Sequence, residues 1–536
     1  MELIMPVLAT TARSTEVRPA DPSLREAIML GLMFAAVKLF LHIAANLWEA
    51  HIGYGYFRDE FYYLVCGRHL DWGYVDHGPI VAVQARLAET IFGHSLAGIR
   101  MFSAMAGAAR VFLTGLLAWS LGGRRPAQGL SMTGILLVPQ YLGLDSYLCM
   151  NSFESLFWMT CLLALILILR GYGEARLWLL FGVSAGLGLL NKPSMTFFLV
   201  TLLMALLISP QRRILFSRWT AVGVAILILI ALPNLLWQIN HQWPTLEFLQ
   251  NGRMENKNIK LPPLSFLIQQ IFTLQPATVL LWGAGLIWLL REKRWRWIGY
   301  NYLFFLAIMM LLHAKDYYVT PIYPVLFAAG GIAWERYFAA RSTVRNNRVF
   351  AFPLYQFVLL AVGIVVMPMA IPVLKPDLWL AYAKATHLYN VSGNSENASS
   401  GLLPQFYADR FGWQEEVDQV TRIYQSLSPE DRSKVGILAS NYGEASAINF
   451  LGKGLPTAIS GHNNYWLWGP QNSTGEVMIV INGASPGEMR KFYDSVEIVG
   501  RMDHPLAMPF EHRNIYLVRG RKKDLSTDWK SLKHYI

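Results

Sequence analysis

The chain is poor in charged residues, in cysteine and in nucleotide-binding motifs, and each shortage excludes a class of protein. Only 15% of its 536 residues are charged, whereas soluble domains usually carry about a quarter. Three cysteines are too few for a disulfide framework. The sequence contains neither a P-loop nor a dinucleotide-binding glycine fingerprint, and no repeat at solenoid spacing. These absences argue against a soluble domain, a disulfide scaffold, a nucleotide-binding fold and a repeat protein.

Apolar residues are abundant instead, at 54% of the chain. They form runs of roughly twenty residues, the length needed to cross a bilayer as a helix. We predict an α-helical polytopic membrane protein with about eleven spans. The expected ranges are 28–48, 97–121, 127–145, 153–169, 176–190, 194–209, 219–237, 266–290, 297–313, 317–334 and 351–373. The first run is longer than a signal-peptide core and lacks a small-residue cleavage site, so we expect a retained span.

The net charge of +11 comes from basic residues in short clusters between the apolar runs. This pattern is typical of topology signals and not of a nucleic-acid-binding surface. The clusters lie in the N-terminal tail and at 124–125, 170–176, 212–218, 291–296 and 336–348. By the positive-inside rule they face the cytoplasm, which places the other loops on the extracytoplasmic side of the cell membrane. We therefore predict a cytoplasmic tail over 1–27, a transmembrane domain over 28–373 and an extracytoplasmic domain over 374–536.

The C-terminal region has a different pattern from the membrane portion. Short apolar segments between turns predict strands at 435–439, 477–481, 496–499 and 515–518. A helix is expected over 415–427. The C-terminal domain is thus predicted to be a small α/β domain.

Two adjacent acids, Asp59 and Glu60, follow the first apolar run. Carboxylates close to a bilayer are costly, so an adjacent pair is a functional-site hypothesis. The functional interpretation is a general base that removes a proton from an acceptor hydroxyl or amine. In the structural alternative, Arg58, Arg68 or interfacial water satisfies the two acids.

Asp76 and His77 lie in the next extracytoplasmic loop, before Gly78 and Pro79. Such a pair could bind a divalent ion or contact a phosphate, but glycine and proline also explain the segment as a turn. An amphipathic segment follows, to about residue 92. Asp76 and Glu154 are the candidate ligands if a divalent metal is used; no other cofactor is indicated.

Further polar residues are expected at extracytoplasmic span ends. Asn151 and Glu154 share one face at the start of a helix, unless Asn151 only caps it. Lys192 and Lys315 could hold an anionic phosphate or extend to the headgroups. Asp316 and Tyr317 follow Lys315 directly and complete the set of candidate substrate-binding residues.

In this order, these motifs resemble the bacterial branch of glycosyltransferase family 39. This family belongs to the GT-C class, which includes protein O-mannosyltransferases and the aminoarabinose transferase acting on lipid A. The resemblance covers about 50 to 375 and rests on residues 56–60, 74–79, 150–154, 191–194 and 315–318, followed by Pro321 and Pro324.

The resemblance implies a sugar donor linked to polyprenyl phosphate and an envelope acceptor, which is a protein, lipid A or another glycan. It assigns Asp59 as catalytic base and Glu60 as its companion acid. The family's motif of an acid, a lysine and two prolines corresponds to Asp76 through Pro79, with His77 and Gly78 in place of lysine and proline. This departure shifts the expected phosphate-binding role to Lys315.

A second function class is a transporter or flippase of lipid-linked sugars, which needs polar residues near the middle of the bilayer. The acids cluster on one face instead, which favours catalysis. Lys38 and His42 in the first span are exceptions, and Lys38 could extend to the cytoplasmic surface. In the C-terminal domain, the segments 441–444 and 460–466 predict polar-aromatic loops that either stack on sugar rings or are ordinary loops.

Overall fold

The computed structural model describes residues 23–340, 348–388, 396–397, 399 and 401–536. Contacts within the chain define two compact units. Unit 1 contains the residues up to 48 together with 100–236 and 260–373, and unit 2 contains 49–99, 237–259 and 374–536. Most of the predicted N-terminal tail and part of the predicted basic loop at 336–348 lie outside the described residues.

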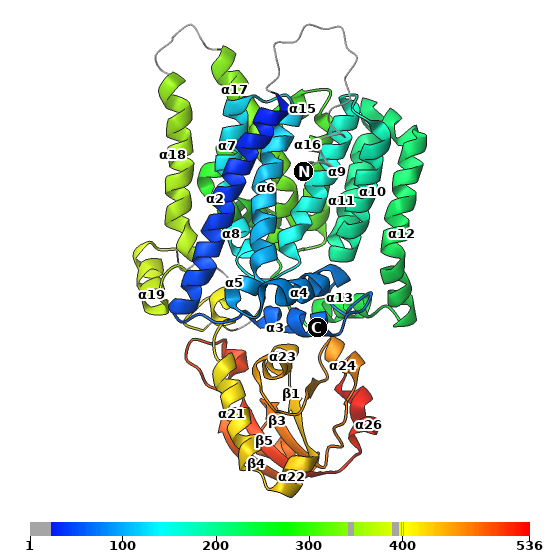
Figure 1. Ribbon diagram of the computed structural model, residues 1–536, viewed down its shortest axis with the longest axis vertical. Helices are drawn as coiled ribbons and strands as arrows, with labels where there is room; N and C mark the ends of the chain where they lie inside the picture. Colours follow the sequence, from blue (N-terminus) through cyan, green and yellow to red (C-terminus); the bar gives the residue numbers. More distant parts are fainter. Residues whose placement is uncertain (1–22, 341–347, 389–395, 398, 400) are drawn as a thin grey trace. The chain divides into compact units, whose positions relative to one another are not determined.

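Unit 1 is helical, and its elements can be followed by colour in Figure 1. Their bounds are α2 Leu24–His51, α6 Met101–Ser120, α7 Arg125–Leu136, α8 Pro139–Asp145, α9 Asn151–Leu169, α10 Glu174–Asn191, α11 Ser194–Leu207, η1 Pro210–Phe216, α12 Arg218–Asn240, α14 Pro263–Thr273, η2 Pro276–Thr278, α15 Val279–Arg291, α16 Arg296–Leu311, η3 Asp316–Ile322, α17 Tyr323–Ala340, α18 Arg348–Val366 and η4 Met367–Met369. Only the ends of α2 and α12 extend into unit 2.

The helical polytopic class predicted from the apolar runs is confirmed. Among the described residues, five helical segments are long and apolar enough to cross a membrane, or up to seven if each bent helix pair is one span. The five are Leu24–His51, Met101–Ser120, Asn151–Leu169, Arg218–Asn240 and Phe352–Met369. The expected total of about eleven membrane spans remains a prediction.

Two of the predicted spans are interrupted. The range 127–145 contains α7 and α8, which separate before Pro139. The range 266–290 contains α14 and α15, whose axes bend by 97° near Pro276. Proline disfavours helical geometry at the residue before it. Val138 is extended at ψ 124°, and Gln275 also lies outside the helical region, at φ 66° and ψ 134°. A continuous helix over either range is therefore wrong.

Unit 2 combines short helices with a five-stranded sheet (Figure 1). The helices are α3 Arg58–Arg68, α4 Pro79–Phe92, α5 Leu96–Ile99, α13 Pro244–Met254, α19 Pro376–Ala385, α20 Gln405–Ala408, α21 Trp413–Ser426, α22 Pro429–Lys434, α23 Tyr442–Leu451, α24 Asn464–Trp468, α25 Pro486–Met489, η5 Pro509–Glu511, α26 Leu525–Asp528 and η6 Trp529–Leu532. The amphipathic segment expected after Pro79 is α4.

The sheet has the order β2-β1-β3-β5-β4, with β1 Val435–Ala439, β2 Ala458–Ser460, β3 Val477–Asn482, β4 Tyr493–Arg501 and β5 Asn514–Arg521. β1 pairs in parallel with β2 and β3, and β5 pairs antiparallel with β3 and β4. The four predicted strands and the helix over 415–427 are confirmed. β2 was not predicted, because three residues are too few to show alternation.

Candidate active site

Asp59 and Glu60 lie in the first turn of α3, where negative charge is favourable because the backbone N–H groups of that turn point toward it. The Glu60 carboxylate accepts a hydrogen bond of 2.8 Å from the Phe57 backbone N–H and is fully buried. Glu60 therefore caps the helix. The Asp59 side chain is 29% exposed, so only the first of the two acids is open to an incoming molecule.

Asp59 is held by a residue of the C-terminal region. The Tyr442 hydroxyl donates a hydrogen bond of 2.8 Å to Asp59 Oδ1, and Arg58 Nε lies 3.6 Å from the same oxygen. Tyr442 is the first residue of α23, and the Asn441 side chain caps that helix by accepting from the Glu444 N–H. The location of Tyr442 thus depends on a capped helix start.

Asp76 is joined to this arrangement through a second tyrosine. The Tyr62 hydroxyl donates a hydrogen bond of 2.9 Å to Asp76 Oδ1. The ring centroids of Tyr62 and Tyr442 lie 4.6 Å apart. Burial raises the pKa of Asp76, while His77 and the Tyr62 hydrogen bond act in the opposite direction. Two predicted residues, Asp59 and Asp76, are therefore connected through a pair of packed tyrosine rings.

His77 is buried against aromatic rings. Its Nδ1 lies 2.8 Å from the Gly78 carbonyl oxygen and donates to it, and its ring stacks on Tyr74 at 4.5 Å. Burial lowers the pKa of His77, although the neighbouring Asp76 raises it. Burial therefore disfavours on His77 the positive charge that a lysine at this position would provide.

In unit 1, the predicted residues Asn151, Glu154 and Lys192 form one cluster. Lys192 Nζ donates to Asn151 Oδ1 at 2.7 Å and to Glu154 Oε2 at 3.0 Å. The Ser194 hydroxyl donates to the other Glu154 oxygen. Lys192 is 8% exposed and Glu154 4%, so this is a buried ion pair at the meeting point of α9, α10 and α11.

The segment after Lys315 completes this cluster. The Lys192 ammonium lies 4.3 Å from the ring centroid of Tyr318 and 5.6 Å from that of Tyr317. Asp316 accepts a hydrogen bond of 3.2 Å from the Thr273 hydroxyl. Lys315 precedes η3 and is half-buried.

A buried ionic cluster in unit 1 was not predicted. The Arg110 guanidinium donates to both carboxylate oxygens of Asp145 at 2.8 Å, to the Ser155 hydroxyl at 2.6 Å and to the Ser152 carbonyl at 2.7 Å. Ser152 and Ser155 lie in the first turns of α9, which also carry Asn151 and Glu154. Arg110 thus braces the helix start that holds Lys192. Arg110 lies inside an apolar run, and no local pattern identifies its partner.

Lys38 belongs to the same cluster and does not extend to the surface. Its ammonium donates to the Leu136 carbonyl at 3.0 Å and lies 3.6 Å from Asp145, and the side chain is 1% exposed. His42 Nε2 lies 3.9 Å from Asp145. The interpretation of Lys38 as a surface-reaching lysine is therefore wrong, because α2 packs this side chain against buried partners.

Each of the two candidate metal ligands already has partners within the protein. Asp76 accepts from Tyr62, and Glu154 is engaged by Lys192 and Ser194. In the part of the chain that the structure describes, no group of three or more His, Cys, Asp or Glu side chains is arranged to hold a metal ion.

Comparison with known proteins identifies the fold. Residues 76–237 match the family described as dolichyl-phosphate-mannose-protein mannosyltransferase. The structure of ArnT from Cupriavidus metallidurans bound to undecaprenyl phosphate is similar with a TM-score of 0.58 and 13% identity, covering 92% of this chain and 98% of ArnT. The apo form of that ArnT gives a TM-score of 0.57.

A further solved structure, the mycobacterial arabinofuranosyltransferase AftD, has a TM-score of 0.51 and 14% identity over 95% of this chain and 41% of AftD. Curated protein sequences give no significant match. The chain is a multi-pass membrane protein with the GT-C glycosyltransferase fold, as its motifs predict.

Proposed function

We propose that this protein transfers a sugar from a polyprenyl-phosphate-linked donor to an envelope acceptor, with Asp59 as general base. The observation that carries the proposal is that, in a chain with the GT-C fold, the Asp59 carboxylate is partly exposed and accepts a hydrogen bond of 2.8 Å from the Tyr442 hydroxyl. The ArnT structure with undecaprenyl phosphate supports a lipid-phosphate carrier. The acceptor is a protein, lipid A or another envelope glycan.

In the proposed reaction, an acceptor hydroxyl oxygen attacks the anomeric carbon of the donor sugar. The bond from that carbon to the phosphate oxygen breaks, polyprenyl phosphate leaves, and the acceptor proton passes to an Asp59 oxygen. A positioned base of this kind contributes about 10²- to 10⁴-fold to the rate. Asp59 has the exposure that this role requires, whereas the Glu60 carboxylate is occupied by the Phe57 N–H.

The leaving phosphate gains negative charge, which cationic side chains stabilise. We assign this role to Lys315 and Lys192, with Tyr317 contacting the carrier. Lys192 donates a hydrogen bond of 3.0 Å to Glu154, and Lys315 is half-buried directly before η3. Asn151 and Glu154 hold Lys192 through hydrogen bonds of 2.7 and 3.0 Å. Asn151 and Glu154 together with Asp76, His77 and Asp316 are the further proposed substrate-binding residues.

We place the protein in the cell membrane, with the candidate site and the C-terminal domain on the extracytoplasmic face. The arginine distribution supports this orientation.

The test is an assay of membranes containing the protein with radiolabelled polyprenyl-phosphate sugar. We expect Asp59→Asn to lower the rate of sugar transfer about 10²-fold or more while the protein stays folded. The matched control is Glu415→Gln, an exposed acid of α21. Normal transfer by Asp59→Asn would contradict the assignment of the base.

The alternative function is a transporter of lipid-linked sugars, which would use the buried cluster of Lys38, His42, Arg110 and Asp145. Arg110 and Lys38 are both paired with protein oxygens, which supports a bracing role for this cluster. Movement of intact donor across vesicles without release of sugar would favour the transporter.

A further inference from the structure

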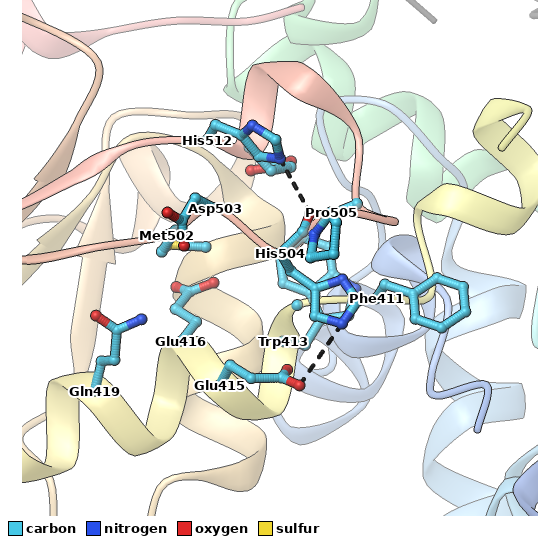
Figure 2. Close-up of a pocket in the computed structure, with 13 residues that line it drawn as sticks. Phe411, Trp413, Glu415, Glu416, Gln419, Met502, Asp503, His504, Pro505 and His512 are labelled. Atoms are coloured by element: carbon cyan, nitrogen blue, oxygen red, sulfur yellow. Dashed lines mark hydrogen bonds and ion pairs between the residues drawn. The ribbon is translucent and has the colours of Figure 1, made fainter. Parts of the chain in front are cut away.

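Unit 2 contains a cavity of about 240 Å³ that lies outside the proposed catalytic residues. The start of α21 forms one wall and the segment 502–512 forms the opposite wall (Figure 2). Its volume is slightly below the roughly 300–1,000 Å³ of typical small-molecule pockets. The cavity has room for a small molecule.

The lining of this cavity is acidic. Four carboxyl side chains contribute to it, while the described lining residues include no lysine or arginine. The four are Glu415, Glu416, Asp503 and Glu511. The basic groups are His504 and His512, and His512 Nε2 already donates to the His504 carbonyl at 3.1 Å. The cavity therefore favours a positively charged ligand.

Glu416 provides an independent observation. Its side chain is 0% exposed, and neither carboxylate oxygen has a hydrogen-bond partner among the described residues. Figure 2 shows the carboxyl group extending from α21 toward Met502 and Asp503. A buried carboxyl group without a partner costs several kcal/mol unless it keeps its proton or meets a cation.

The surroundings of Glu416 do not supply that cation. Glu444 on α23 and Glu511 on η5 are its acidic neighbours, and Arg513 is the nearby guanidinium. Arg513 Nε already forms an ion pair of 2.9 Å with Glu444. Arg513 is thus shared among Glu416, Glu444 and Glu511, and Arg58 also acts on Glu511.

The side chains that line the cavity favour an organic cation. No described group of three or more metal-ligating side chains converges here. The wall also carries the stacked rings of Phe411 and His504, 5.5 Å apart, next to Trp413. Aromatic faces and carboxylates together suit an ammonium group on a carbon skeleton.

We propose that this cavity is a second binding site, selective for an organic ammonium group, in which Glu416 and Glu511 pair with the cation. The ammonium group belongs either to a free polyamine or to an amino sugar. This site is separate from the proposed transfer reaction, and its occupancy does not depend on Asp59.

The test measures binding to the full-length protein in detergent by isothermal titration calorimetry. Putrescine is compared with butane-1,4-diol, which has the same carbon skeleton without charge, and glucosamine is compared with N-acetylglucosamine. We expect the ammonium probe of at least one pair to bind at least tenfold tighter than its neutral partner. Putrescine binding assigns a polyamine, and binding of glucosamine alone assigns an amino sugar.

The variant Glu416→Gln should weaken binding of the ammonium probe at least tenfold, whereas Glu430→Gln, at an exposed acid of α22 outside the cavity, should change it less than threefold. Thermal stabilisation of the unmodified protein by putrescine, but not by the diol, provides a readout independent of any variant. Equal binding of charged and neutral probes, or no stabilisation by either ammonium probe, would overturn the proposal. Either result would show that Glu416 and Glu511 are neutralised by protons and not by a bound cation. Because Asp59→Asn should leave this binding unchanged, failure of the proposed transfer reaction is distinguishable from failure of this site.

Discussion

The Tyr442 hydroxyl donates a hydrogen bond of 2.8 Å to Asp59 Oδ1, although 383 residues separate them in the sequence. The contact joins the first turn of α3 to the first turn of α23. It fixes the direction of one carboxylate oxygen, and the Asp59 side chain stays 29% exposed.

Tyr442→Phe should slow sugar transfer while leaving the fold intact. A hydrogen bond to a charged group contributes about 1.5–3 kcal/mol, which corresponds to a rate loss of roughly 10- to 150-fold if it acts in the transition state. The phenylalanine keeps the packing on Tyr62. The measurement is kcat and KM for the lipid-linked donor.

Tyr465→Phe is the matched control for Tyr442→Phe, because it removes a hydroxyl that contacts Ser446 in the same domain. A rate loss of equal size in both variants would indicate a general effect on the domain.

Glu60→Gln should act on stability more than on chemistry. The Glu60 carboxylate accepts from the Phe57 N–H. A glutamine oxygen can still accept this bond, but the variant loses the negative charge that the first helical turn favours, which contributes about 0.3–1 kcal/mol. We expect a lower thermal midpoint and a modest loss of transfer, in contrast with Asp59→Asn. A Glu60→Gln protein with unchanged stability and an Asp59→Asn-like rate would assign Glu60 to catalysis.

Arg110→Met should destabilise unit 1 strongly. Removing one partner of a buried ion pair costs about 3–5 kcal/mol, since Asp145 is left without its two bonds of 2.8 Å. Lys38→Met should cost less, because Lys38 lies 3.6 Å from Asp145 and leaves the Arg110 pair in place. Thermal unfolding in detergent measures the loss of stability in both variants. A larger loss for Lys38→Met than for Arg110→Met would contradict the bracing role of Arg110.

Lys192→Met should reduce both stability and transfer, because it leaves Glu154 buried without its cation. Adding Glu154→Gln should restore the thermal midpoint, since a neutral amide replaces the unpaired charge. We expect transfer to remain low in the double variant. Recovery of activity together with stability would show that Lys192 has a structural role only.

The stability of unit 2 should fall as the pH rises from about 4.5 to about 7. Burial first, and then Glu444, raise the pKa of Glu511 to about 7, and burial raises the pKa of Asp409 to about 7. In this window the unfolded chain releases these protons while the folded chain keeps them, so the unfolded state gains stability with pH. For Glu511 the effect is on the order of 3 kcal/mol.

The measurement is the thermal midpoint in detergent between pH 4.5 and pH 7.5. Glu511→Gln should flatten its dependence on pH. A midpoint that rises with pH across this window would contradict the raised pKa values.

The sequence by itself determined that the protein is a helical membrane protein and where its polar motifs lie along the chain. Runs of about twenty apolar residues predict membrane helices because a helix of that length spans a bilayer. The alternation of short apolar strands with turns predicts the C-terminal α/β domain for an equally local reason. The order of the motifs from residue 56 to residue 318 resembles that of the GT-C class and so predicts the GT-C fold.

The tertiary structure decided what each polar residue contacts. Asp59 and Glu60 are adjacent carboxylates in the sequence, yet their contacts differ. Glu60 is buried and caps the start of α3, whereas Asp59 is partly exposed and accepts a hydrogen bond from Tyr442. Lys38 could extend to the surface by its position along α2, but helix packing gives it Asp145 and the Leu136 carbonyl. Hydrogen bonds and ion pairs depend on distances between segments far apart in the chain, and local sequence patterns do not carry those distances.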